Sequence, residues 1–196
     1  MKQASDLTFV PPNYAIWQLY DPSAKVDLFS TALRVGRGTL MVDPVPLTAD
    51  ARVELGKIEA VLVTNANHAR AAADFAGPDP ILVPTELAND FPNAQYLADG
   101  MRIHGLTAMA IPGAVPGEFA FHDARDGGAL IVGDALINFG PDGFCLLPAK
   151  YCVDRKEMIR SLHNLLDFTF VRAFFAHGFP IVTGARDRLA ALLSGL

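Results

Sequence analysis

Long apolar runs are missing from the sequence, and none approaches the roughly 18 to 20 residues needed to span a bilayer. The first residues, MKQASDLTFVPPN, contain no apolar core of a signal peptide. We therefore expect a cytoplasmic protein with no membrane partner. Positive charge is also scarce, because 16 Lys and Arg residues stand against 21 Asp and Glu residues and the formal net charge is −5. Nucleic-acid-binding proteins favour a basic patch, so we expect no nucleic-acid partner.

Cysteine is rare, and several catalytic motifs are missing. The two cysteines, Cys145 and Cys152, do not have the CxxC spacing of a metal site. We expect free thiols in a reducing compartment, with a local disulfide as the alternative. The sequence contains no G-x-S-x-G elbow, no P-loop and no G-x-G-x-x-G motif, and Gly36-Arg37-Gly38 is too short for the last of these. These absences argue against a serine-elbow hydrolase and against the common nucleotide-binding folds.

Hydrophobic residues make up 51% of the 196 residues, which is enough for a sizeable core, and we expect one domain over residues 1–196. Short apolar runs alternate with helical patterns, which indicates an α/β fold. The chain divides near residues 99–100 into two similar halves. We expect strands near residues 15–20, 28–35, 39–42, 60–63, 81–83, 101–111, 118–122, 129–132 and 171–176, and helices near residues 48–55, 68–77, 85–91, 154–166 and 187–193.

Polar residues stand where the expected buried strands stop. These groups are Asp43, the turn 64–70, the proline-glycine loop 111–118, Gly133-Asp134 and His177-Gly178. Loops that converge at one edge of a sheet sandwich form a shared cleft. The sequence therefore predicts a cleft whose floor contains several of these side chains.

The order of these segments resembles the metallo-β-lactamase superfamily. The matching parts are a hairpin ending in Val42-Asp43, the strand–turn–helix from residue 61 to 76, the loop IPGAVPGE, the strand end in ALIVGDAL and the segment FFAHGFP. The resemblance implies a four-layer αββα sandwich of two mixed sheets flanked by helices. It also implies one or two zinc or iron ions in the cleft and a hydrolytic reaction.

The family's metal-binding motif is degenerate in this sequence. The turn T-H-x-H-x-D-H of the family reads T-N-A-N-H-A-R over residues 64–70, and its loop P-G-H-T-x-G reads P-G-A-V-P-G over residues 112–117. Asp134 and His177 are the two ligand positions that remain, and His68 falls on a position that is not a ligand in the family. Because zinc needs three or four donors, we expect no bound metal. The alternative is one zinc or iron ion held by His68, Asp134 and His177.

Two hypotheses for the cleft follow. In the first, the protein is metal-free: Arg70 and Asp134 form an ion pair in the former metal position, with Asn65, Asn67 and His177 as hydrogen-bond partners. That pair is either purely structural or part of a site for a small anionic ligand. In the second, the protein is a hydrolase with a mononuclear site. The candidates for catalytic roles are His177, His68 and Asp134. We interpret the other histidines as surface or packing residues: His104, His122 and His163.

Overall fold

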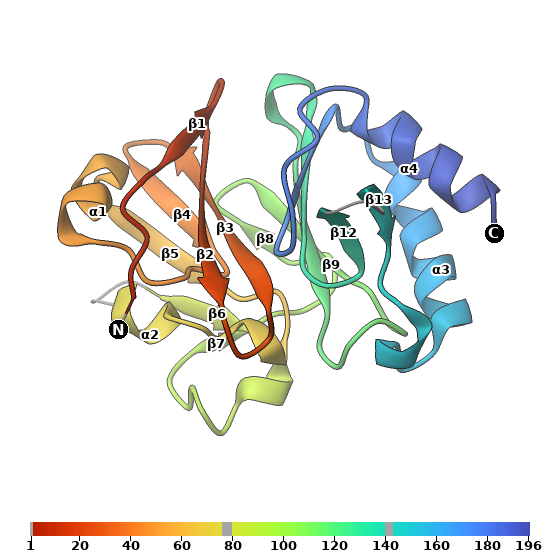
Figure 1. Ribbon diagram of the computed structural model, residues 1–196, viewed down its shortest axis with the longest axis horizontal. Coiled ribbons are helices and arrows are strands. Elements are labelled where there is room, and N and C mark those ends of the chain that lie inside the picture. The colour runs from red at the N-terminus through yellow and green to blue at the C-terminus, as the bar shows by residue number, and fades with distance from the viewer. Residues whose placement is uncertain (1, 76–79, 140–142) are drawn as a thin grey trace.

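The computed structural model describes residues 2–75, 80–139 and 143–196. Two β-sheets pack face to face, and helices lie on the outer side of each sheet (Figure 1). Helices α1 and α2 cover the first sheet, and α3 and α4 cover the second (Figure 1). The predicted four-layer αββα sandwich is confirmed. The predicted division near residues 99–100 is confirmed too, because the first sheet ends with β7 at Tyr96 and the second begins with β8 at Arg102.

The first sheet contains seven strands in the order β1-β2-β3-β4-β5-β6-β7. The first four strands are antiparallel, and the pairs from β4 onward are parallel. Parallel strands need crossover connections, which α1 and α2 help to supply. The bounds are β1 Thr8–Val10, β2 Tyr14–Asp21, β3 Val26–Val35, β4 Gly38–Val42, α1 Ala49–Leu55, β5 Ile58–Leu62, η1 Ala66–His68, α2 Ala72–Phe75, β6 Ile81–Val83, η2 Thr85–Leu87 and β7 Gln95–Tyr96.

The second sheet has the order β14-β11-β10-β9-β8, and a separate hairpin is formed by β12 and β13. Strand β14 pairs in parallel with β11, so both strands end at the same edge of the sheet. The bounds are β8 Arg102–Ile103, β9 Leu106–Ala110, β10 Phe119–Asp123, η3 Arg125–Gly127, β11 Ala129–Val132, β12 Leu136–Phe139, β13 Gly143–Leu146, η4 Ala149–Tyr151, α3 Arg155–Asn164, η5 Leu165–Asp167, β14 Arg172–Phe175 and α4 Ala185–Ser194.

Three apolar layers hold the sandwich together. Leu33 and Leu62 from the first sheet meet Phe121 and Phe174 from the second in the central layer. The outer layers lie between each sheet and its helices. Strands in a sheet covered on both faces are apolar on both faces, which is why residues 40–42 of β4, residues 60–62 of β5 and all of β11 read as continuous apolar runs rather than as alternating patterns.

The helix starts show which local signals were reliable. Thr48 and Asp154 are N-caps, as predicted, and each side chain accepts hydrogen bonds from the first turn of its helix. The helix predicted from residue 68 is wrong in its start: a 3₁₀ turn covers residues 66–68, and α2 begins only at Ala72. Arg70 causes this delay, because its φ of 39° lies outside the helical region. The predicted end of that helix, at Gly77-Pro78, lies outside the described residues.

Two further differences concern short elements. The helix predicted over residues 85–91 is only the 3₁₀ turn η2. Strand β1 and the β12–β13 hairpin were not predicted, because each is short and lies beside proline or glycine residues. Cys145 and Cys152 do not form a disulfide with each other. Across the described ranges, the helices are too short or too polar to cross a membrane.

Candidate functional site

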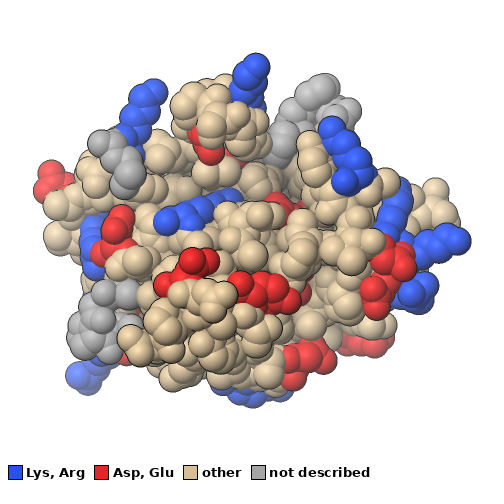
Figure 2. Space-filling view, turned by 90° about the horizontal axis from the view of Figure 1, so that it is seen from below, with Lys and Arg blue, Asp and Glu red and all other residues tan. Residues whose placement is uncertain are grey.

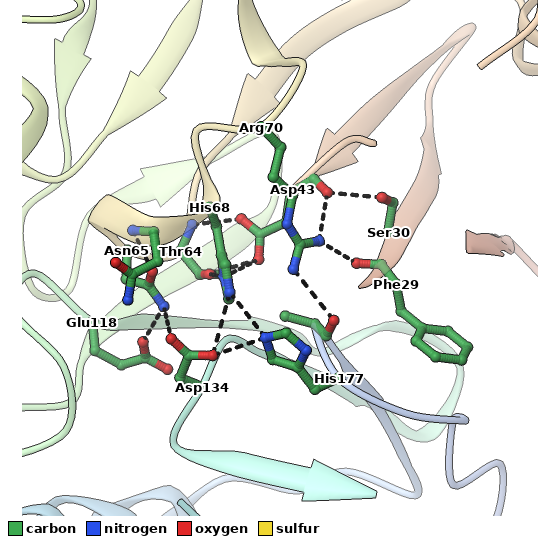
Figure 3. Close-up of polar contacts among 12 residues, drawn as sticks. Phe29, Ser30, Asp43, Thr64, Asn65, His68, Arg70, Glu118, Asp134 and His177 are labelled. Carbon is green, nitrogen blue, oxygen red and sulfur yellow. Dashed lines mark hydrogen bonds and ion pairs between the residues drawn. The ribbon is translucent and has the colours of Figure 1, made fainter. Parts of the chain in front are cut away.

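Five chain segments meet at one edge of the sandwich, as the strand-end pattern predicted. Asp43 follows β4, the turn 64–68 follows β5, and Asp134 and His177 follow the neighbouring strands β11 and β14. Glu118 directly precedes β10. Figure 3 shows these side chains pointing toward one another from both sheets. The site therefore depends on how the two halves of the chain are packed.

Three donor atoms lie at the centre of this cluster. The distance from His177 Nε2 to Asp134 Oδ1 is 3.0 Å, and the distance from His68 Nε2 to the same oxygen is 3.3 Å. The two Nε2 atoms lie 3.3 Å apart. Zinc binds nitrogen and oxygen at about 2.0 to 2.2 Å, so tetrahedral donors stand roughly 3.3 to 3.6 Å apart. The triangle of donors is thus only slightly tighter than one face of a tetrahedral metal site.

A buried carboxylate fixes the orientation of the His68 ring. Asp43 Oδ2 lies 3.0 Å from His68 Nδ1, and the Thr64 hydroxyl donates to the same Asp43 oxygen at 2.6 Å. The Thr64 backbone N–H donates to Asp43 Oδ1 at 2.8 Å, which holds the carboxylate in place. With a proton on Nδ1 facing Asp43, the Nε2 atom of His68 faces Asp134 and His177. This carboxylate–histidine arrangement is the usual support behind a metal-binding imidazole.

The electrostatics of the cluster favour a positive charge at its centre. Burial opposes ionisation of Asp134, but its hydrogen bonds with His177 and His68 outweigh that effect and hold its pKa below the usual range. Burial and the charge of Arg70 would lower the pKa of His68, yet Asp43 and Asp134 raise it to about 9. Without a metal, that positive charge is a proton on His68. With a divalent ion at the centre, His68 is neutral and the ion supplies the charge.

Arg70 does not pair with Asp134, so the predicted ion pair is wrong. Its guanidinium donates to the backbone carbonyls of Phe29 at 2.6 Å, Asp43 at 3.0 Å and Ala176 at 3.3 Å. Among the described residues, no carboxylate lies within ion-pair distance of the Arg70 guanidinium. The ion-pair partners of Asp134 are instead His68 and His177. Three carbonyl oxygens that converge at the ends of the strands match the planar fork of a guanidinium. Arg70 thereby ties the first sheet to the segment that carries His177 (Figure 3).

The two asparagines of the turn have different places. Asn65 is buried, and its side-chain N–H₂ donates to Glu118 Oε2 at 2.6 Å and to Asp134 Oδ2 at 3.1 Å. Its side-chain oxygen accepts from the Asn67 backbone N–H, which caps the 3₁₀ turn and directs His68 inward. Asn67 has an exposed side chain that lines the cleft. Asn65 therefore contacts Asp134 directly, whereas Asn67 faces the space above the site.

Glu118 is a buried member of the site that was not predicted. Its carboxylate accepts from Asn65 and, at 3.0 Å, from the Ala135 backbone N–H. Burial and the nearby charge of Asp134 raise the pKa of Glu118 to about 8. Glu118 stands at the end of the proline-glycine loop and just before a strand, and this position in the sequence could have marked it as a site residue. Asp43 carried the same kind of signal, at the end of β4.

The site opens into a cleft of about 950 Å³. His68, Asp134, His177 and Arg70 lie among its lining residues. One wall comes from the β2–β3 hairpin, and the other includes the β12–β13 hairpin and the η4 turn. A volume of this size is typical of sites for small-molecule ligands.

Comparisons with known proteins agree with the observed fold. A family model described as the metallo-beta-lactamase superfamily matches residues 8–196. No curated protein sequence matches the chain. Among solved structures, the DIM-1 metallo-β-lactamase exposed to ceftazidime is similar with a TM-score of 0.73 and 12% identity, covering 99% of this chain and 98% of that one.

Two other solved structures extend the comparison. A metallo-β-lactamase family protein from Thermus thermophilus is 21% identical with a TM-score of 0.66, over 94% of this chain and 79% of that one. A metallo-β-lactamase from Erythrobacter litoralis is 17% identical with a TM-score of 0.69, over 97% and 92% of the two chains. At these identities the likeness establishes the shared fold, and the chemistry has to be argued from the site itself.

Proposed function

The chain belongs to the metallo-β-lactamase superfamily, and from this premise we propose that it is a hydrolase with one divalent metal ion, held by His68, Asp134 and His177. The observation that supports the proposal is the triangle of donor atoms, whose edges are 3.0, 3.3 and 3.3 Å. Two imidazoles and one carboxylate are a donor set that zinc accepts in catalytic sites, where a further position stays open. The cleft supplies space for a substrate beside that position.

The remaining residues make a second metal ion unfavourable. Asn65 directs its N–H₂ group toward Glu118 and Asp134, and an N–H donor is not a metal ligand. Ala114 replaces the family's histidine in the proline-glycine loop and offers no donor atom. The amide of Asn65 thus bridges the carboxyl groups of Glu118 and Asp134, where the raised pKa of Glu118 keeps the two from both being charged at neutral pH. The proposal is therefore a single-ion site.

The residues beside the three donor atoms would have distinct roles around that ion. Asp43 keeps the Nδ1 proton of His68 facing away from the centre, so that Nε2 is available as a donor. Asn65 holds Asp134 Oδ2, which leaves Asp134 Oδ1 directed at the two histidines. A bound divalent ion supplies Lewis-acid chemistry, which polarises a carbonyl oxygen of a substrate. His68 and His177 are metal ligands in this proposal rather than acid–base groups.

A metal-free protein is the competing function, and the raised pKa of His68 is the observation that favours it. In that state a protonated His68 lies between Asp43 and Asp134, and the cleft binds a small anion. The two states differ in what occupies the centre of the donor triangle: a proton on His68 or a metal ion. Metal binding by purified protein separates them.

Zinc titration of chelator-treated protein by calorimetry tests the proposal. We expect one zinc ion per chain in the wild type and at least a 100-fold loss of affinity in the His177→Ala variant, because two donors rarely hold zinc. The matched control is His163→Ala, which removes an exposed histidine from α3 and should leave the affinity unchanged. Absence of zinc binding, or equal binding by the His177→Ala variant, would contradict the single-ion site and favour the metal-free state.

A further inference from the structure

Strand β2 has a free edge over its second half. Strand β1 pairs with β2 only as far as the pair of Thr8 and Ile16, whereas β3 pairs with β2 along its whole length. The N-terminal segment then leaves this edge, and Ala4 pairs with Leu47 instead. Within the described chain, residues 17–21 therefore have a neighbouring strand on one side only, over a length of about 16 Å. Such an edge is a template for a further strand.

The register of the sheet shows which backbone groups point toward this edge. The Arg34 N–H donates to the Asn13 carbonyl at 2.8 Å, so these two opposite residues form a hydrogen-bonded pair. Bonded and non-bonded pairs alternate along an antiparallel ladder, so Gln18 and Tyr20 direct their N–H and C=O groups away from β3. Ile16 points the same way and meets β1. Gln18 and Tyr20 lie beyond β1, and no described residue hydrogen-bonds to these four groups.

A groove of about 460 Å³ follows the free edge. It lies between β2 and the N-terminal segment, and none of the three proposed metal ligands lines it. Two aromatic side chains of its lining are largely exposed, Tyr20 at 50% and Phe179 at 60%. The Phe179 ring packs edge-on against Phe29, with the ring centres 5.2 Å apart. The groove therefore offers aromatic surface beside unpaired backbone groups.

The charged residues of the groove are acidic. Among its described lining residues these are Asp6 and Asp27, both exposed, and no lysine or arginine lines it. Asp27 lies opposite Tyr20 in the β2–β3 ladder, so a cation beside one can reach the other. Figure 2 shows acidic and basic side chains scattered over a larger uncharged area, so the groove lining itself has to select a partner. A second copy of this chain would bring its own aspartates, and like charges disfavour that pairing.

We propose that the free edge of β2 binds an extended segment of a partner protein, in which basic residues alternate with apolar ones. The segment adds as an antiparallel strand in line with β1. Its residues opposite Gln18 and Tyr20 exchange backbone hydrogen bonds with them, and their side chains lie on the same face of the sheet. Basic side chains there reach Asp27 and the rings of Tyr20 and Phe179. The apolar residue between them lies on the other face, beside Leu19.

Two peptides with blocked ends, Val-Arg-Val-Arg-Val and Val-Glu-Val-Glu-Val, test the charge of the partner. In calorimetric titrations of the wild-type protein, we expect one arginine peptide per chain and an affinity at least tenfold higher than that of the glutamate peptide. We also expect the arginine peptide to change the fluorescence of Trp17, the one tryptophan of the chain, which lines the groove. No binding of the arginine peptide, or equal binding of both peptides, would overturn the proposal.

N-methylated peptides separate strand addition from simple attraction of a basic peptide to an acidic protein. A methyl group on the backbone nitrogen of the second arginine removes an N–H that faces β2. A methyl group on the nitrogen of the central valine removes an N–H that faces away from β2. We expect at least a tenfold loss of affinity from the first change and wild-type affinity after the second. Equal effects of the two changes would overturn the strand addition.

Charge-reversal variants locate the site on the protein. We expect Asp27→Lys to weaken binding of the arginine peptide at least tenfold. The control, Asp167→Lys, makes the same change in net charge at an exposed position outside the groove lining, and it should keep the wild-type affinity. The same loss in both variants, or no loss in Asp27→Lys, would overturn the assignment to the groove.

Sedimentation velocity tests the other occupant of the edge, a second copy of the chain. We expect the arginine peptide to leave the sedimentation coefficient of the wild-type protein unchanged. A dimer that dissociates when the peptide is added would assign the edge to a second copy and overturn the proposed partner.

Discussion

The Asp43→Ala variant is expected to bind zinc about 10- to 100-fold more weakly than the wild type, because Asp43 holds the His68 ring by its Nδ1 atom. It is also expected to lose about 3 to 5 kcal/mol in free energy of unfolding. The change removes a carboxylate that is 2% exposed and leaves the Thr64 N–H and hydroxyl without their acceptor. Calorimetric titration and urea unfolding of the same preparation measure the two effects.

The control for Asp43 is a second buried carboxylate that lies outside the site. Asp123 is 1% exposed, and it accepts from the Tyr14 hydroxyl at 2.7 Å and from Arg125 at 2.8 Å. The Asp123→Ala variant should therefore lose a comparable free energy of unfolding but keep the zinc affinity of the wild type. An unchanged zinc affinity in the Asp43→Ala variant, or the same loss in both variants, would mean that Asp43 does not position a metal ligand.

Stability and zinc binding of the chelator-treated protein are expected to change in opposite directions between pH 6.5 and 9. The pKa of His68 is raised from 6.5 to about 9 in the folded protein, so protonation of His68 stabilises the fold fully below pH 6.5. That contribution, roughly 3 kcal/mol for this change in pKa, is lost as the pH rises through 9. The raised pKa of Glu118 acts in the same direction, through pH 8.

Zinc competes with the same proton. Because His68 must be neutral to bind the ion, zinc affinity should rise about tenfold per pH unit below pH 9, for one displaced proton. Asp43 and Asp134 have lowered pKa values, so their contribution to stability is present above about pH 4 and is lost only in acid. Urea unfolding and zinc titration at several pH values measure the two trends. In the His68→Gln variant, the free energy of unfolding should fall less between pH 6.5 and 9. A wild-type free energy of unfolding that stays constant over this range would refute the assignment of a proton to His68.

Buried strands, helix caps and strand-end residues are local signals, and they predicted the α/β organisation, whereas the four-layer sandwich was expected from the resemblance to the metallo-β-lactamase superfamily. Asp134 and His177 follow β11 and β14, and their meeting required only that these strands be neighbours. The capping residues Thr48 and Asp154 acted as expected. These features depend on short stretches of sequence, which one chain displays directly.

The contacts within the site depend on tertiary structure and were predicted less well. His68 was expected to be off the ligand position, yet the turn capped by Asn65 directs it toward Asp134. Arg70 was assigned a carboxylate partner on charge alone, whereas its partners are three carbonyl oxygens from distant segments. The positions of backbone carbonyls after folding leave no signal in composition or spacing. The position of Glu118 before a strand was visible in the sequence, but its contact with Asn65, 53 residues away, depends on the tertiary structure.

Anomalous diffraction at the zinc edge, from crystals grown with zinc, tests the single-ion site most directly. The account predicts one peak per chain, within about 2.0 to 2.2 Å of His68 Nε2, Asp134 Oδ1 and His177 Nε2. Crystals of the His177→Ala variant grown in the same way should lack this peak. No peak at these three atoms in wild-type crystals, or a second peak beside Asn65 and Glu118, would contradict it.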